Sequence, residues 1–284
     1  MQLGTLIPQR DIGGSPSALR EFAQAAESLG YDFLETTDHV LGPNAESRHD
    51  PFVLFGFLAG LTSLGFATGV LVITQRQAVL AAKQAASLDV LCGGRFRLGV
   101  GIGSNSAEFA ALNQDSHDRG LRSAEQVEVM QKLWTSHHVS IEGRWHRIKD
   151  AGINPRPTNG RIPVWFGGHH NLTIRRIAKY GDGWIMLAYP MGRRAVAEFD
   201  KLRWLTEAEG RDPKNLGLEV WVSTGTGGPT DWRQELRFWK NAGITHVTVA
   251  STHGVTPHVR IVGRTMKDHI DAIKQYRRVV ADLL

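Results

Sequence analysis

The sequence predicts an α/β protein built as one closed β/α barrel. Eight short segments that are apolar and rich in β-strand-forming residues recur along the chain, and each is followed by a helical pattern. The segments are apolar throughout, which indicates burial on both faces and is typical of a parallel sheet covered by helices. Eight such units within 284 residues favour a closed (β/α)8 barrel of the TIM type over an open, doubly wound sheet.

The order of elements follows from these segments. The predicted strands are Leu3–Ile7, Phe33–Thr36, Phe66–Ile73, Phe96–Val100, Val164–Phe166, Trp184–Leu187, Leu218–Val222 and Val247–Ala250. The predicted helices cover residues 17–29, 52–64, 78–91, 122–135, 171–180, 195–209, 231–242 and 266–282. Gly30 and Gly93-Gly94 follow two of these helices, at the position where glycine commonly ends a helix.

One stretch could be mistaken for a membrane segment. Residues 51–75 carry no charge and are long enough to cross a bilayer. The stretch also contains four glycines and four Ser or Thr residues, and it divides into a helical half and a β-rich half. We therefore interpret it as a buried helix followed by a buried strand, and expect no contact with a membrane.

The alternation is interrupted once, after the fourth strand. The helix 122–135 fills part of the gap between Val100 and Val164, and the remainder, 137–163, is polar and contains three prolines. We predict a single domain over residues 1–284, in which the insertion 137–163 lies over the active-site rim and, with Trp145 and His146, closes over a substrate.

Composition excludes several classes of protein. Apolar residues make up 42% of the chain and charged residues 21%, as in a soluble globular protein. Cys92 is the only cysteine and no signal peptide is visible, so we expect a reducing, cytoplasmic location. The net charge of +5 mildly favours an anionic ligand, but the basic residues are scattered, and we expect no nucleic-acid partner.

Candidate functional residues are those that follow the strands, because the C-terminal ends of the strands form the active site of a parallel barrel. Asp38 and His39 follow the second strand, where a carboxylate beside an imidazole can hold a ring N–H and supply a proton donor. A structural aspartate and a buried, satisfied histidine would give the same pattern. Glycine-rich loops follow the fourth strand, at Gly101 and Gly103, and the fifth, at Gly167-Gly168. Glycine lets the backbone approach a ligand closely, and the following helices offer free N–H groups to an anion.

Other motifs are absent. Gly99-x-Gly101-x-Gly103 is not the Gly-x-Gly-x-x-Gly fingerprint of dinucleotide sites. Twelve histidines include no His-x-His and no His-Glu-x-x-His, so we predict no metal site. No Gly-x-Ser-x-Gly is present, which argues against a serine hydrolase of that type.

Three blocks of sequence carry a resemblance to a known family. The first runs from Leu64 through the Gly69-Val70 pair and Arg76 to Gly101, the second is Pro155-Arg156-Pro157 with Ile162–Gly168, and the third is Gly181-Asp182-Gly183-Trp184. Over nearly its whole length the chain resembles the luciferase-like monooxygenase superfamily, and within it the coenzyme F420-dependent oxidoreductases. The resemblance implies the same barrel, of the bacterial luciferase-like kind.

The resemblance also implies roles for particular residues. Asp38 would contact the ring system of a deazaflavin, coenzyme F420, and His39 would lie near the face where hydride is transferred. Gly69-Val70 corresponds to a non-proline cis peptide bond that backs the ring in that branch. The remaining cofactor-binding candidates contact the phosphate and ring edge: Gly101, Gly103, Ser104, Gly167, Gly168 and Arg193. Arg194 is an alternative to Arg193 for the phosphate or the acidic tail.

The resemblance leaves alternatives open. FMN-using members share much of the pattern, so FMN is the alternative cofactor. Sugar-phosphate dehydrogenases of the family carry a glutamate where Ser104 stands here, so their substrate is not predicted. A non-catalytic cofactor-binding barrel is a second reading and a metal-dependent hydrolase a third. The expected partners are a small-molecule substrate and, through the last helix, a second copy of the chain, although a buried barrel helix predicts the same apolar pattern.

Overall fold

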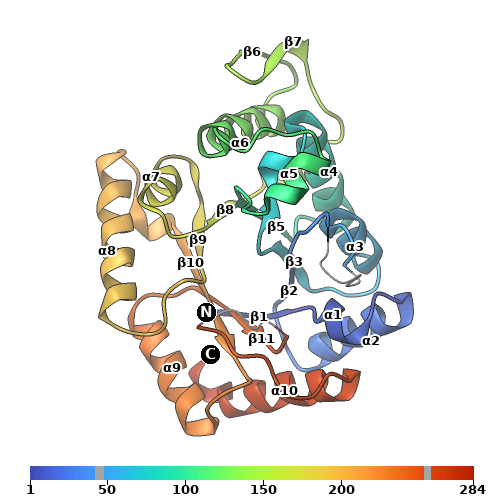
Figure 1. Cartoon of the computed structure of the whole chain (residues 1–284), viewed down its shortest axis with the longest axis vertical. Helices are drawn as coiled ribbons and strands as arrows, with labels where there is room; N and C mark the ends of the chain where they lie inside the picture. The colour runs from blue at the N-terminus through green and yellow to red at the C-terminus, as the bar shows by residue number, and fades with distance from the viewer. Residues whose placement is uncertain (42–47, 253–256) are drawn as a thin grey trace.

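The computed structural model describes residues 1–41, 48–252 and 257–284, and it contains a parallel sheet closed into a barrel with helices on the outside (Figure 1). The strands of the barrel are β1 (Gln2–Leu6), β2 (Phe33–Thr36), β3 (Gly65–Thr68), β4 (Leu71–Val72), β5 (Phe96–Gly101), β8 (Val164–Gly167), β9 (Gly183–Met186), β10 (Gly217–Ser223) and β11 (His246–Ala250). β3 and β4 are successive parts of the third strand, so the described residues give the eight strands that the sequence predicts.

Strand pairing closes the sheet. β1 pairs with β2 on one side and with β11 on the other, which brings the first and last strands together. β5 pairs with β8 on one side and with both β3 and β4 on the other. Every pairing within the barrel is parallel, so all strands end at the same end of the barrel. The predicted barrel is therefore confirmed.

Helices surround the barrel. They are α1 (Gln9–Ile12), α2 (Pro16–Ser28), α3 (Pro51–Leu58), α4 (Ala78–Leu91), α5 (Ser106–Ala111), α6 (Arg119–Thr135), α7 (Asn171–Tyr180), α8 (Arg193–Ala208), α9 (Pro229–Asn241) and α10 (Met266–Val279). Three 3₁₀ turns, η2 (Ile73–Gln75), η3 (Pro213–Asn215) and η4 (Ala281–Leu283), complete the described elements. Among the described residues, no helix is both long enough and apolar enough to span a bilayer.

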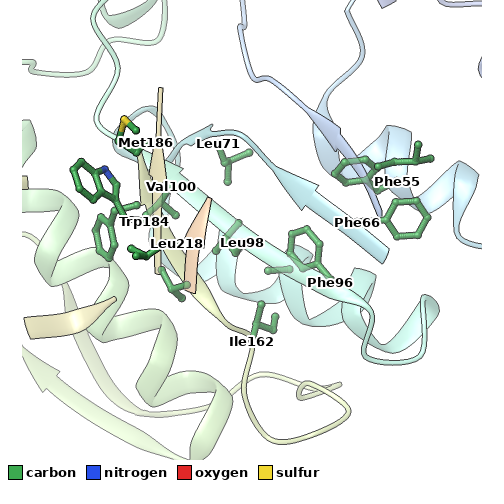
Figure 2. Packing of buried hydrophobic residues seen from close by; sticks show 14 of the residues in the cluster. Phe55, Phe66, Leu71, Phe96, Leu98, Val100, Ile162, Trp184, Met186 and Leu218 are labelled. Carbon is green, nitrogen blue, oxygen red and sulfur yellow. The ribbon is translucent and has the colours of Figure 1, made fainter. Parts of the chain in front are cut away.

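The main hydrophobic core lies between the sheet and the helices. On β5, Phe96, Leu98 and Val100 are buried and lie among the core side chains that Figure 2 shows, while the alternate residues face the barrel interior. Phe55 of α3 packs on Phe66 of β3 with ring centroids 4.9 Å apart. The uncharged run 51–75 is thus a buried helix and a buried strand, as its composition predicts.

The third strand differs in detail from the prediction. It is expected as one strand over 66–73, but it is interrupted between β3 and β4 by a cis peptide bond at Gly69-Val70, the position that the resemblance implies. The helix expected over 52–64 ends at Leu58. The short helix α5 was not predicted, because six residues are too few to produce a helical period.

The insertion forms a small hairpin of its own. Within it, β6 (Val139–Glu142) and β7 (Arg147–Ala151) form an antiparallel hairpin whose turn is bound by Glu125 of α6. The chain after the hairpin reaches α4, where Lys83 donates to the Asn154 carbonyl and Asp89 accepts from the Thr158 N–H. The hairpin packs on α6 and projects from the body of the molecule (Figure 1), and the Trp145 indole donates to Asp118 at 2.8 Å. Closure of the insertion over the active-site rim stays a prediction.

Candidate active site

The loops that follow β2, β4, β5 and β8 meet at the C-terminal end of the barrel. The Val72 N–H donates to the Asp38 carboxylate at 2.9 Å, and the Thr74 hydroxyl donates to the Ile102 carbonyl at 2.8 Å. Val70 lies against both Gly101 and Gly167. The structure therefore brings together the turns that the sequence nominated, and we call this end of the barrel the mouth.

Asp38 is buried and holds an arginine. Arg76 approaches both of its carboxylate oxygens, at 2.9 Å and 3.4 Å, and also pairs with Asp50, the N-cap of α3, at 2.8 Å. Burial raises the pKa of Asp38, although Arg76 and the Val72 N–H favour its ionised form. Asp38 and Asp50 together raise the pKa of Arg76 despite its burial. Asp38 thus fixes the backbone after the cis peptide bond through Val72.

His39 is paired with a residue that the sequence did not nominate. Its Nδ1 lies 3.1 Å from Oε1 of Glu108, and 44% of the His39 side chain is exposed. Glu108 is almost fully buried and also accepts from the Gln75 side chain at 2.9 Å and from the Leu41 N–H at 3.3 Å. Burial opposes ionisation of Glu108, but these hydrogen bonds outweigh it and lower its pKa. Glu108, rather than Asp38, is the carboxylate that orients the imidazole.

A sequence signal for Glu108 exists but is weak. Glu108 lies in the first turn of α5, after the glycine-rich loop, where Asn105 caps the helix. An acidic residue there is also the ordinary complement to a helix N-terminus. The partners are 69 residues apart, so sequence spacing alone does not connect them.

The position of the Val70 side chain explains why two nearby residues are glycines. A Cβ on Gly101 would lie 2.4 Å from Cγ2 of Val70, and one on Gly167 would lie 2.6 Å from Cγ1 of Val70. A Cβ on Gly69 would lie 1.7 Å from Oε1 of Glu35, inside the barrel. Gly101 and Gly167 therefore make room for the Val70 side chain, which covers them at the base of the mouth.

The remaining candidates lie around this base. Gly103 has φ +69°, and a Cβ there would meet Val72 and Phe109. Gly168 has φ +105°, and its carbonyl accepts from the Trp184 indole at 2.7 Å. Both glycines thus have conformations that other residues rarely adopt. Ser104 and Arg193 are exposed, and Arg193 begins α8, whose N-terminus has no side-chain cap.

Buried charges lie inside the barrel beneath the mouth. The indole of Trp221 donates to Glu35 at 3.0 Å, and Arg97 pairs with Glu219 at 2.7 Å. Burial, reinforced by the neighbouring Glu219, raises the pKa of Glu35 well above its ordinary value. Burial thus favours the protonated form of Glu35, and its carboxyl lies directly behind Gly69.

Comparisons with known proteins show which enzymes this chain is similar to. An F420-dependent glucose-6-phosphate dehydrogenase of Segniliparus rotundus is 33% identical over 178 residues, which cover 60% of this chain and 53% of that protein. An FMNH(2)-dependent dimethylsulfone monooxygenase of Pseudomonas putida is 27% identical over 207 residues, covering 72% of this chain and 57% of that protein. The matched region thus spans a little more than half the length of these curated relatives.

A solved structure and a family match extend the comparison to most of the chain. An F420-dependent secondary alcohol dehydrogenase in complex with an F420-acetone adduct superimposes with a TM-score of 0.81 over 98% of both chains, at 17% identity. At that identity the likeness establishes the fold alone. Residues 1–256 match the luciferase-like monooxygenase family. The chain belongs to the luciferase-like monooxygenase family.

Proposed function

We propose that the protein is an oxidoreductase that binds coenzyme F420 in the mouth and transfers a hydride between this cofactor and a small organic substrate. The observation that carries the proposal is the His39–Glu108 pair, in which a buried carboxylate holds an exposed imidazole at the end of the barrel where the glycine loops meet. FMN, used by the dimethylsulfone monooxygenase relative, is the alternative cofactor.

The residues of the mouth are compatible with a flat ring and an anionic tail. The side chain of Val70 covers Gly101 and Gly167, so the base of the mouth presents an apolar surface to a flat ring. The two glycines add no side chains of their own there. Arg193 opens α8 at a helix N-terminus whose N–H groups have no side-chain cap. Free N–H groups beside a guanidinium suit a phosphate.

His39 would move the proton that accompanies hydride transfer. Because Glu108 accepts at Nδ1, the ring carries its hydrogen on that nitrogen in the neutral form and leaves Nε2 to accept or donate at the substrate oxygen. Glu108 is thus a positioning residue and His39 the catalytic residue.

Asp38 and Arg76 would hold the base of the mouth in place. Asp38 fixes the Val72 N–H, and Arg76 ties Asp38 to the start of α3 through Asp50. A bound F420 supplies a carbon that accepts or gives a hydride, while the surrounding residues orient it and limit access of water.

Cofactor titration tests the first half of the proposal. We expect saturable quenching of protein fluorescence by F420 at micromolar concentrations, and much weaker binding of FMN. Tighter binding of FMN would assign the FMN alternative, and no binding of either would overturn the proposal. Binding without turnover of any alcohol, aldehyde or ketone tested would favour the non-catalytic cofactor-binding barrel.

Variants test the roles of His39 and Glu108. His39→Ala should lower kcat by about 10²-fold or more, the usual contribution of a general acid or base, with a smaller change in F420 affinity. Glu108→Gln should lower kcat less than His39→Ala does, because the amide can still contact the imidazole but holds it less firmly than a carboxylate, and F420 affinity should change little. His138→Ala is the matched control, since His138 is exposed and pairs with Asp150 at 3.2 Å on the hairpin. Unchanged kcat in both mouth variants would contradict the assignment.

The substrate and the assembly are not assigned by these residues. Ser104, in place of the glutamate of sugar-phosphate dehydrogenases, argues against that substrate. The carboxylate that pairs with His39 is Glu108. The homodimer stays a prediction, which sedimentation of the purified protein would test.

A further inference from the structure

A second cavity lies at the end of the barrel opposite the mouth. Its volume is about 1110 Å³, and it is lined by the first residues of several strands, among them Gln2, Phe33, Gly65 and His246. We call it the N-terminal cavity.

The N-terminal cavity is rich in positive charge. Its lining includes five basic side chains and three carboxylates. Each carboxylate already accepts a backbone N–H, from Leu3 to Asp32 at 2.7 Å, from Val164 to Asp182 at 2.9 Å and from Lys214 to Asp212 at 2.9 Å. The three carboxylates therefore stabilise the loops through these hydrogen bonds. The lining contains two more basic side chains than carboxylates.

Two of the basic groups have hydrogen-bonding capacity to spare. The guanidinium of Arg97 lies between the rings of Phe33 and Trp165, 4.7 Å and 4.1 Å from their centroids. Its Nη2 approaches Glu219, but its buried Nη1 has no hydrogen-bond partner among the described residues. The ammonium of Lys214 likewise has no ion pair or hydrogen bond within the described ranges.

The other groups around Arg97 do not neutralise it further. Burial, with Arg97 nearby, lowers the pKa of His246 to about 3, so this imidazole is neutral at physiological pH. Arg161 uses part of its hydrogen-bonding capacity within the protein, because one nitrogen of its guanidinium pairs with Asp182. Guanidinium and ammonium groups arranged around one cavity match the geometry and charge of a phosphate or carboxylate.

We propose that the N-terminal cavity is a second binding site, separate from the mouth, for a small molecule that carries a phosphate or carboxylate group. The anionic group would lie among Arg97, Arg161 and Lys214, with its remaining body against Trp165. The alternative is a cavity that holds only water. In that case its exposed cations attract anions only through weak interactions that salt screens. Saturable binding at fixed ionic strength separates the two cases.

The test is calorimetric titration of the full chain with pyrophosphate and, separately, with citrate, at constant ionic strength. We expect saturable binding of at least one of these probes, and the stronger of the two identifies the anionic group as phosphate or carboxylate. The double variant Arg161→Gln/Lys214→Gln should weaken binding at least about tenfold, the effect of losing one charge-assisted hydrogen bond.

Two controls locate the site. Lys149→Gln removes an exposed cation from the hairpin and should leave binding unchanged. Arg193→Gln removes the cation proposed for the cofactor phosphate, so loss of binding in this variant would place the anion at the mouth and overturn the proposal. No saturable heat with either probe, or equal affinities of the double variant and the wild type, would also overturn it. None of these results depends on the proposed enzymatic activity.

Discussion

The base of the mouth and the β6–β7 hairpin both hold an irregular stretch of backbone, but they do so by different means. At the mouth, Val70 fills the space above Gly101 and Gly167. In the hairpin turn, one carboxylate, Glu125, accepts from the N–H groups of Arg144, Trp145 and His146 and from the His146 ring. The first region depends on the shape of its neighbours. The second depends on polar side chains, since the Trp145 indole also donates to Asp118 at 2.8 Å.

This difference predicts how each region responds to change. A close-packed interior tolerates no added volume, because neighbours on several strands must move together. A turn held outside the barrel by hydrogen bonds can open without disturbing the sheet. Substitutions at the mouth should therefore affect the whole molecule, and substitutions at the hairpin should affect the hairpin alone.

The largest effect is expected for Gly101→Ala. The added Cβ would lie 2.4 Å from Val70, so we expect a loss of about 2–3 kcal/mol in the free energy of unfolding, measured by urea denaturation. Gly56→Ala is the matched control, because Gly56 lies within α3 with open space around its Cβ position. That change should stabilise the protein by about 0.5–1 kcal/mol. Equal stabilities for the two variants would contradict the packing argument.

An intermediate effect that depends on pH is expected for Glu35→Gln. The pKa of Glu35 is raised above its ordinary 4.5, so the folded state keeps a proton that the unfolded state releases, and stability falls as pH rises through that window. The amide of the variant does not titrate, so the stability of the variant should not fall over this pH range. Relative to the wild type, the variant should gain stability as pH rises above ~5, by less than the loss expected for Gly101→Ala. Urea denaturation at about pH 5 and pH 8 measures this, and exposed Glu21→Gln should show no such trend.

The smallest effect on global stability is expected for Glu125→Ala. Its loss frees three backbone N–H groups of the hairpin turn, which should exchange with solvent faster, as hydrogen-exchange mass spectrometry would measure. We expect the unfolding free energy to change by less than about 1 kcal/mol. Glu128→Ala, on the same helix, removes only an exposed pair with Lys132 and is the control. A global loss as large as that of Gly101→Ala would show that the hairpin is coupled to the barrel.

The same contrast explains what the sequence could predict. The barrel follows from local patterns that repeat eight times, and Asp38 and His39 follow from their position after a strand. The Glu108–His39 pair could not be predicted, because it depends on how two distant loops pack. The hairpin within residues 137–163 could not be predicted either, since it depends on polar contacts with α6 and α4 that no sequence pattern indicates. The roles of Gly101 and Gly167 required the position of the Val70 side chain.

Cys92, at the end of α4, has a practical consequence. It is the only cysteine in the chain, its side chain is almost fully buried, and burial raises the pKa of its thiol. A buried thiol that resists ionisation reacts slowly with alkylating reagents. A cysteine introduced at an exposed position, such as that of Arg144 in the hairpin turn, would therefore be labelled selectively in the native chain, so that a single dye reports on that position without removal of the natural thiol.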